Sequence, residues 1–188
     1  ELILLGDIHL GSPQCDVPRF LRMVDYCNKS NTPVLLMGDL IELATRHSVG
    51  SGVYEQEFIG QTQYEQMCEY LMPLAKKKLI LGTHAGNHEA RAYVLSGVDV
   101  SKAFARELGV PYLGDACWNL FTVEREQKFN GAKDRFTSER QSYSIYSLHG
   151  RSGARFDGTA LLALERLAAP FHADVVCIGH SHKLVSSS

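Results

Sequence analysis

The stretch LILLGDIHLG, residues 2–11, places a carboxylate and an imidazole directly after an apolar run. Leu2–Gly6 has the length and composition of a strand that is buried on both faces. The polar residues directly after it are Asp7 and His9. Polar side chains this close to a core must be hydrogen-bonded, paired or bound to a ligand. The binding partners of Asp7 and His9 therefore decide the role of this end of the strand.

The same arrangement recurs along the chain. Apolar runs that end in glycine, with polar residues close behind, predict three further strands: Val34–Gly38, Leu79–Gly82 and Asp174–Gly179. Amphipathic patterns predict three helices: Pro18–Asn28, Glu55–Lys77 and Val100–Leu108. Pro73 is expected to break or kink the second helix. The order of elements is β-α-β-α-β, which is typical of an α/β fold.

The second half of the chain has a different pattern. Cys117–Glu124 and Gln141–Leu148 alternate in part between apolar and polar residues, and the turn signal Asn130-Gly131 lies between them, so a hairpin is expected. A helix over Thr159–Ala169 precedes the last strand. We therefore predict one domain, residues 1–188, with the fold of an α/β sandwich of two mixed β-sheets flanked by helices.

Composition restricts the class of protein. The chain has 188 residues and a net charge of −2, which gives no overall attraction to nucleic acid or to an anionic membrane. It has no apolar run of the roughly 18 residues that a membrane span needs. Its five cysteines are widely spaced, and none forms a C-x-x-C motif. This pattern indicates reduced thiols and predicts a cytoplasmic protein without a membrane partner.

Metal-ligating side chains come after five of the predicted strands. These strand ends carry Asp7 and His9, Asp39, Asn87 and His88, His149, and His180 with His182. Residues i and i+2 of an extended backbone point the same way, so Asp-x-His and His-x-His each offer two donors on one side. Oxygen and imidazole donors without thiolate suit divalent ions such as Mn, Fe or Zn. Two such ions leave a positive site, for which a phosphate anion is the natural guest.

The motifs Asp7-x-His9, Gly38-Asp39, Gly86-Asn87-His88-Glu89, His149 and Gly179-His180-x-His182 occur together in this order. In this they resemble the calcineurin-like metallophosphoesterase family, over nearly the whole chain. The resemblance implies this ligand set for two ions: Asp7, His9 and His182 for the first, Asn87, His149 and His180 for the second, and Asp39 bridging both. It also implies that His88 faces the substrate, and that Asp7 orders His88 directly or through a further carboxylate.

The family's two-metal chemistry implies a reaction. A hydroxide bridging the two ions attacks phosphorus in line with the leaving oxygen, so the expected activity is metal-dependent hydrolysis of phosphoester bonds. Mn is the metal we favour, with Fe, Zn, Ni, Co and Mg as alternatives. Because imidazole ligands must be neutral to bind metal, activity is expected to fall in acid. We favour a phosphodiesterase that acts on a small molecule.

The sequence departs from the family pattern at three places. Glu42 stands where many relatives have aspartate or arginine, and some pyrophosphohydrolases of lipid A synthesis have a similar glutamate. Arg151 comes after His149-Gly150 where Gly-His or Gly-Asp is frequent. The chain continues for only six residues after His182, whereas relatives usually add further strands, so we expect a domain that is cut short at the C-terminus.

Substrate contacts are less defined than metal ligands. The candidates are Arg46, His47, Arg91 and Arg151. For Arg46 and His47 a solvated loop is an equal alternative. Arg91, one turn into the helix expected after His88, could instead pair with Glu89 or with a surface carboxylate. His84 lies near the motifs and is expected to be structural.

Other functions remain open at this point. GDIHLG resembles the opening motif of double-strand-break-repair nucleases, so a DNA or RNA nuclease is the first alternative. A phosphomonoesterase and then a protein phosphatase rank after it. Some members of this fold have lost ligands and serve as scaffolds, but no ligand position is missing here. The sequence does not predict the oligomeric state.

Overall fold

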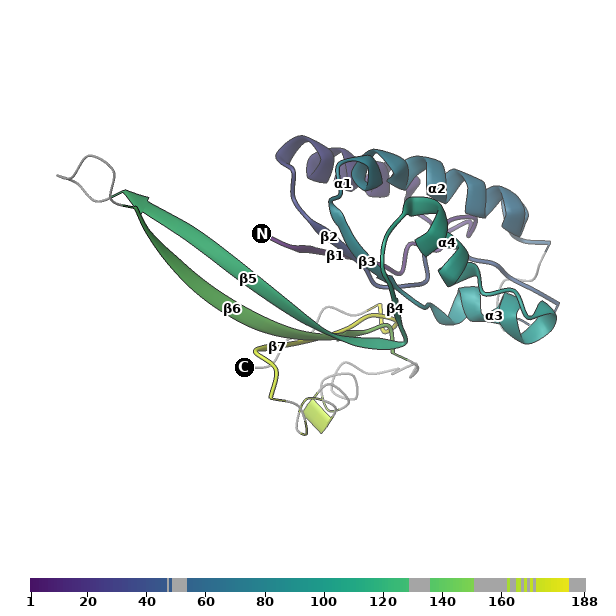
Figure 1. Ribbon diagram of the computed structural model, residues 1–188. Helices are drawn as coiled ribbons and strands as arrows, with labels where there is room; N and C mark the ends of the chain where they lie inside the picture. Colours follow the sequence, from purple (N-terminus) through teal and green to yellow (C-terminus); the bar gives the residue numbers. More distant parts are fainter. Residues whose placement is uncertain are drawn as a thin grey trace.

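A computed structural model gives the fold of the chain (Figure 1). It describes residues 1–46, 48, 54–128, 136–150, 162, 165, 166, 168, 170 and 172–182. Most of the helix predicted over Thr159–Ala169 and the turn predicted at Asn130-Gly131 lie outside the described residues. The prediction that a single domain spans residues 1–188 and is cut short at its C-terminus stays a prediction.

The first half of the chain forms a parallel sheet. Its strands, in spatial order, are β1 (Ile3–Leu5), β2 (Val34–Leu36), β3 (Ile80–His84) and β4 (Tyr112–Gly114). All three pairings between them are parallel. The helices are α1 (Val17–Ser30), α2 (Gly60–Lys76), α3 (Asn87–Ser96) and α4 (Val100–Leu108). Every strand of this sheet therefore ends at the same edge, from which the predicted ligands of β1, β2 and β3 continue.

Local sequence explains where the helices begin and end. The Asp16 carboxylate accepts a hydrogen bond from Arg19 N at the start of α1, and Asp99 does the same for α4. Gly109 ends α4 in the left-handed conformation that glycine adopts without strain. Pro73 lies inside α2, which continues to Lys76, so the expected break does not occur.

The second sheet has three strands. Its members are β5 (Ala116–Lys128), β6 (Phe136–Leu148) and β7 (Val175–Ile178). β5 and β6 pair antiparallel as the expected hairpin, and β7 pairs parallel to β6. Both hairpin strands extend further into the intervening polar segment than the sequence predicted. They project beyond the rest of the molecule (Figure 1).

The two sheets and the helices form layers. The helices lie on one side of the four-stranded sheet and the three-stranded sheet lies on the other (Figure 1). Leu36, Met67, Leu71 and Phe104 are fully buried in one core cluster formed by β2, α2 and α4. The predicted α/β sandwich of two sheets flanked by helices is confirmed, and the structure adds that the first sheet is wholly parallel while only the second is mixed.

Candidate metal centre

Two neighbouring turns build the floor of the site. The turn after β1 donates backbone hydrogen bonds from Ile8 N and His9 N to the Asp39 carbonyl oxygen, over 2.9 and 3.1 Å. Asp39 belongs to the turn after β2, and its side chain is fully buried. These bonds hold Asp7, His9 and Asp39 in one place at the sheet edge.

The backbone of the ligands is not extended. Five of the predicted metal ligands have positive φ angles: Asp7 (52°), His9 (53°), Asp39 (48°), His180 (67°) and His182 (51°). The argument that residues i and i+2 of an extended strand point the same way is therefore wrong here. The strands end before the ligands, and left-handed turns aim the side chains into the site instead.

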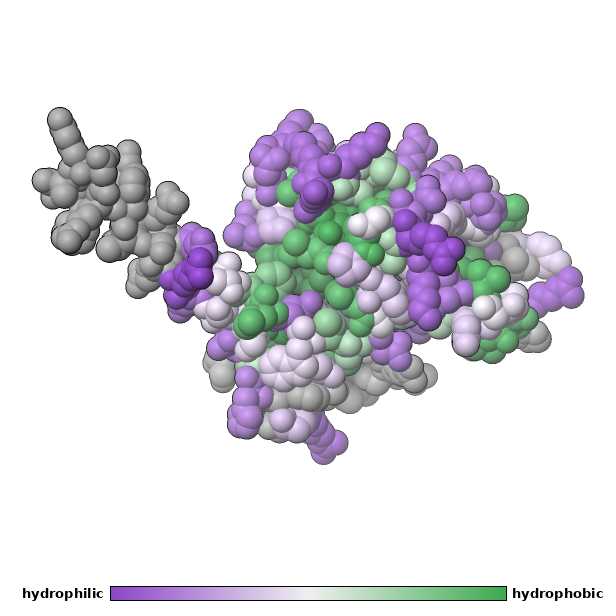
Figure 2. Space-filling view, in the orientation of Figure 1, coloured by the Kyte–Doolittle hydropathy of each residue, from purple (hydrophilic) through white to green (hydrophobic). Residues whose placement is uncertain are grey.

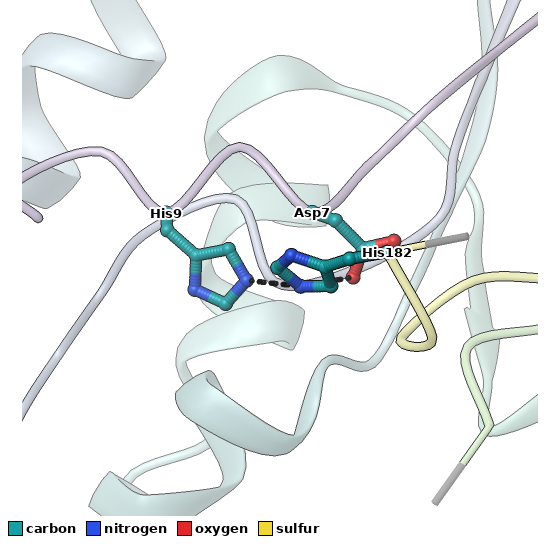
Figure 3. Close-up of side chains that lie close together, drawn as sticks. All are labelled: Asp7, His9 and His182. Carbon is teal, nitrogen blue, oxygen red and sulfur yellow. Dashed lines mark hydrogen bonds and ion pairs between the residues drawn. The ribbon is translucent and has the colours of Figure 1, made fainter. Parts of the chain in front are cut away.

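Asp7, His9 and His182 form the first cluster (Figure 3). His9 Nε2 lies 3.1 Å from His182 Nε2, and His182 Nε2 lies 3.7 Å from an Asp7 carboxylate oxygen. The same carboxylate accepts a hydrogen bond from His180 N over 2.9–3.0 Å. The end of β1 and the segment after β7, far apart in the sequence, thus meet at one point.

The second cluster is more deeply buried. It contains Asp39, His149 and His180, and Asn87 joins it because its Oδ1 lies 2.8 Å from His149 Nε2. His149 Nε2 also lies 3.1 Å from Asp39 Oδ2. Among the described residues, the buried atoms Asp39 Oδ2 and His180 Nδ1 find no hydrogen-bond partner of good geometry. Asp39 Oδ2 is also 3.8 Å from His9 Nε2, so it lies between the two clusters.

Carbonyl and carboxylate oxygens fix the tautomers of three imidazoles. His149 Nδ1 lies 2.8 Å from Met37 O, and His88 Nδ1 lies 2.7 Å from Glu42 O. His9 Nδ1 lies 3.1 Å from the Glu42 carboxylate. Because these oxygens only accept, each Nδ1 carries a hydrogen, and in the neutral form of each imidazole Nε2 has the lone pair. In His9 and His149 that lone pair faces the clusters, as metal-ligating histidines require.

Charge in the site favours a bound cation. Burial raises the pKa of Glu42, but the contacts of Glu42 with His88 and His9 together lower this pKa by more. The net pKa is about 2, so Glu42 stays ionised. Burial also lowers the pKa of His149, yet the Asp39 carboxylate raises it above its usual value. His149 Nε2 thus faces two oxygens that both attract positive charge. The donor set and the unpartnered buried atoms fit divalent ions.

A family model described as calcineurin-like phosphoesterase matches residues 2–184. The chain belongs to the calcineurin-like phosphoesterase family. It is therefore a metal-dependent phosphoesterase, and its substrate is a phosphoester. A search of curated proteins found no match.

Two carboxylates of this phosphoesterase have roles that the sequence did not predict. Glu42 orients His9 and His88 and lies 3.7 Å from the Arg91 guanidinium. Glu89 is fully buried and accepts hydrogen bonds from the backbone nitrogens of residues 39, 40 and 41 over 2.7–3.2 Å. Their positions next to Asp39 and His88 in the motifs were the available signals. Glu89 shapes the turn that carries Asp39, and Glu42 contacts His88 directly. The described contacts of the Asp7 carboxylate are with His180 and His182, so the expectation that Asp7 orders His88 stays a prediction.

Of the four candidate substrate contacts, the structure brings one to the site. Arg91 is brought to the site: it lies 2.9 Å from His88 Nε2 and donates to Glu42 O over 3.1 Å, so it does not pair with Glu89. Arg46 is exposed in the loop after β2. His47 and Arg151 lie outside the described residues.

His84 has the expected structural role. Its Nδ1 lies 3.1 Å from Gly114 O, and its Nε2 lies 2.8 Å from the Ser147 hydroxyl. The imidazole therefore joins β3 to β6 beneath the site and is buried between the two sheets.

Among the described residues, no helix has the length and apolar character needed to cross a membrane.

Proposed function

We propose that this phosphoesterase hydrolyses phosphodiesters, and one observation carries the proposal. Two cavities of similar size are each lined in part by residues of the ligand clusters or their neighbours. The polar cavity, of about 410 Å³, is lined by Asp7, His9, Glu42 and His88 among others. The α3 cavity, of about 390 Å³, includes Asn87 and Arg91 in its lining. A diester has two organic groups that each need space beside the phosphorus, whereas a monoester has one.

The proposed ligands are those that the family resemblance implies. Asp7, His9 and His182 would hold one ion, Asn87, His149 and His180 the other, and Asp39 both. The bound ions supply Lewis acidity and a water of lowered pKa. Mn is favoured because oxygen and imidazole donors are mixed without thiolate.

His88 and Arg91 are proposed to act on the substrate itself. Burial lowers the pKa of His88, but Glu42 and Asp39 raise it above its usual value, which suits a general acid near neutral pH. Its Nδ1 is fixed by Glu42 O, so Nε2 is the atom that exchanges a proton with the leaving oxygen. In the complex, the phosphate would replace the contact between His88 Nε2 and the guanidinium, which are 2.9 Å apart. Arg91 then binds a phosphoryl oxygen with its N–H donors.

Turnover of two nitrophenyl esters tests the proposal. Bis(p-nitrophenyl) phosphate and p-nitrophenyl phosphate are compared with Mn present and after chelation. We expect the diester to be preferred, chelation to abolish turnover, and His88→Ala to reduce kcat about 10²–10⁴-fold. His172→Ala is the matched control, because His172 is exposed and lies outside the clusters. Preferential turnover of the monoester would refute the diesterase assignment.

The nuclease alternative is tested by repeating the assay at low and high salt with DNA as the substrate. A nuclease that neutralises several backbone phosphates loses affinity steeply with salt, whereas a small diester changes little. The cavity volumes are within the range of small-molecule sites and support a small substrate. The cytoplasmic location stays a prediction.

A further inference from the structure

α3 carries exposed apolar side chains next to the metal centre. Val94 is 82% exposed and Leu95 is 54% exposed, and neighbouring Tyr93 and Val98 are similarly exposed. Figure 2 shows apolar atoms on the surface at the end of the molecule where α3 lies in Figure 1. Apolar residues gathered in this way on a soluble protein commonly mark a binding site.

These side chains share one helix face with the site. Arg91 follows Asn87 by four residues, and Val94 and Leu95 follow Arg91 by three and four, so these residues form a continuous row along α3. The same four residues line the α3 cavity, and Thr45 of the loop after β2 faces them. At 1.5 Å per residue, the row from Asn87 to Leu95 is about 12 Å long. The cavity thus runs from a proposed metal ligand to an apolar surface.

Charge is present at only one end of this row. The Arg91 guanidinium is held there by Glu42 and His88, over 3.1 Å to Glu42 O and 2.9 Å to His88 Nε2. Beyond Arg91 on α3, Val94 and Leu95 line the cavity, and Thr45, Ser48 and Ala90 complete its lining without adding charge. A ligand that fits this row has an anionic head at Arg91 and an apolar group beyond it. The polar cavity on the other side of the clusters lacks this character, because carboxylates and imidazoles line it.

We propose that the natural substrate carries an alkyl or aryl group on its phosphoester, and that this group lies along α3 against Val94 and Leu95. The proposal rests on the proposed function, because the phosphoryl group must be anchored at the metal centre and Arg91. It names the substrate class: an amphipathic phosphoester with an apolar arm of about 12 Å or less.

Binding of phosphonates, which are not hydrolysed, tests this arm. Methyl-, butyl- and octylphosphonate are titrated into the Mn-loaded protein by calorimetry. A fully buried methylene strengthens binding about fourfold, and the open cavity gives part of this. We expect octylphosphonate to bind at least tenfold more tightly than methylphosphonate. The double variant Val94→Ser/Leu95→Ser should remove most of that difference.

Val123→Ser is the matched control, because Val123 is also an exposed valine, 55% accessible, but lies on the projecting hairpin. It should keep the full difference between the phosphonates. Equal affinities for the three phosphonates, beside intact turnover of bis(p-nitrophenyl) phosphate, would overturn this proposal alone. Absence of any phosphonate binding and of turnover would overturn the proposed function with it. A wild-type dimer that the double variant converts to monomer would assign this face to a second copy and also overturn it.

Discussion

Replacing Glu89 by glutamine changes one atom of a buried carboxylate that binds three consecutive backbone N–H groups. Oε1 accepts from Leu40 N over 2.7 Å and from Ile41 N over 3.2 Å, and Oε2 accepts from Asp39 N over 3.1 Å. Glutamine keeps one accepting oxygen and turns an NH₂ group toward the third backbone donor. The side-chain NH₂ group and the backbone N–H of Asp39 are both donors, and they then face each other in a fully buried position.

The magnitude can be worked out from these bonds. A hydrogen bond to a charged group contributes about 1.5–3 kcal/mol, and an unsatisfied buried donor costs about 1–3 kcal/mol. Losing one such bond and weakening two others should lower the free energy of unfolding by about 3 kcal/mol. For a domain of this size, that corresponds to a fall in Tm of about 6–12 °C. Metal affinity should also fall about 10–100-fold, because the turn that carries Asp39 loses its support.

Calorimetric unfolding in excess chelator measures the first effect, and Mn titration measures the second. Glu69→Gln is the control, because Glu69 is exposed on α2 and has the same change in charge. If Glu89→Gln lowers Tm by no more than this control, the carboxylate does not hold the turn and the reasoning fails.

The other predictions concern the same turns and the sheet interface. Glu42→Gln should weaken Mn binding about 10–100-fold in a calorimetric titration, because the charge that orients His9 is lost; unchanged affinity would contradict this role. Gly86→Ala should destabilise the protein by about 3 kcal/mol or more in urea, because a Cβ there collides with Asp39 N and the Glu89 carboxylate. Gly97→Ala, where a Cβ meets open space, should cost only about 1–2 kcal/mol for its positive φ. Burial lowers the pKa of His84 below 6.5 in the folded protein. As pH falls, the unfolded chain therefore takes up a proton on His84 at a higher pH than the folded protein does, and stability is lost below about pH 6.5. His84→Gln should show a smaller loss between pH 7.5 and 5.5 in urea unfolding, and an equal loss would exclude His84 as the cause.

The convergence of the ligands could be predicted from the sequence because it depends on local pattern. Short apolar runs that end in glycine predict parallel buried strands, and such strands bring the residues after their carboxyl ends to one edge of the sheet. Gly38 illustrates the limit of this reasoning, since its φ of 87° leads directly into the left-handed Asp39. The rule of alternation along a strand has no information on where the strand stops. It therefore predicted correctly that Asp7 and His9 lie close together, but it assumed the wrong backbone conformation for both residues.

Contacts between residues that are far apart in the chain could not be predicted from the sequence. Glu42 contacts His88, 46 residues later, through both its carbonyl and its carboxylate, and no spacing rule predicts this. The length of the hairpin was underestimated for a different reason. Where both faces of a two-stranded ribbon meet water, apolar residues need not alternate with polar ones, and the segment reads as a loop. The backbone pairing there continues as far as Lys128 and Phe136.

The left-handed conformation of five proposed ligand residues has an evolutionary consequence. A non-glycine residue in this region costs about 1–2 kcal/mol relative to glycine, so together the five cost about as much as a whole domain's net stability. Glycine at Asp39 or His180 would relax the chain and destroy the site. Selection for thermostability alone would thus remove ligands one at a time, and a fold that keeps all five does so against its own stability. A homologous chain with glycine at these positions would be a more stable protein without catalytic activity.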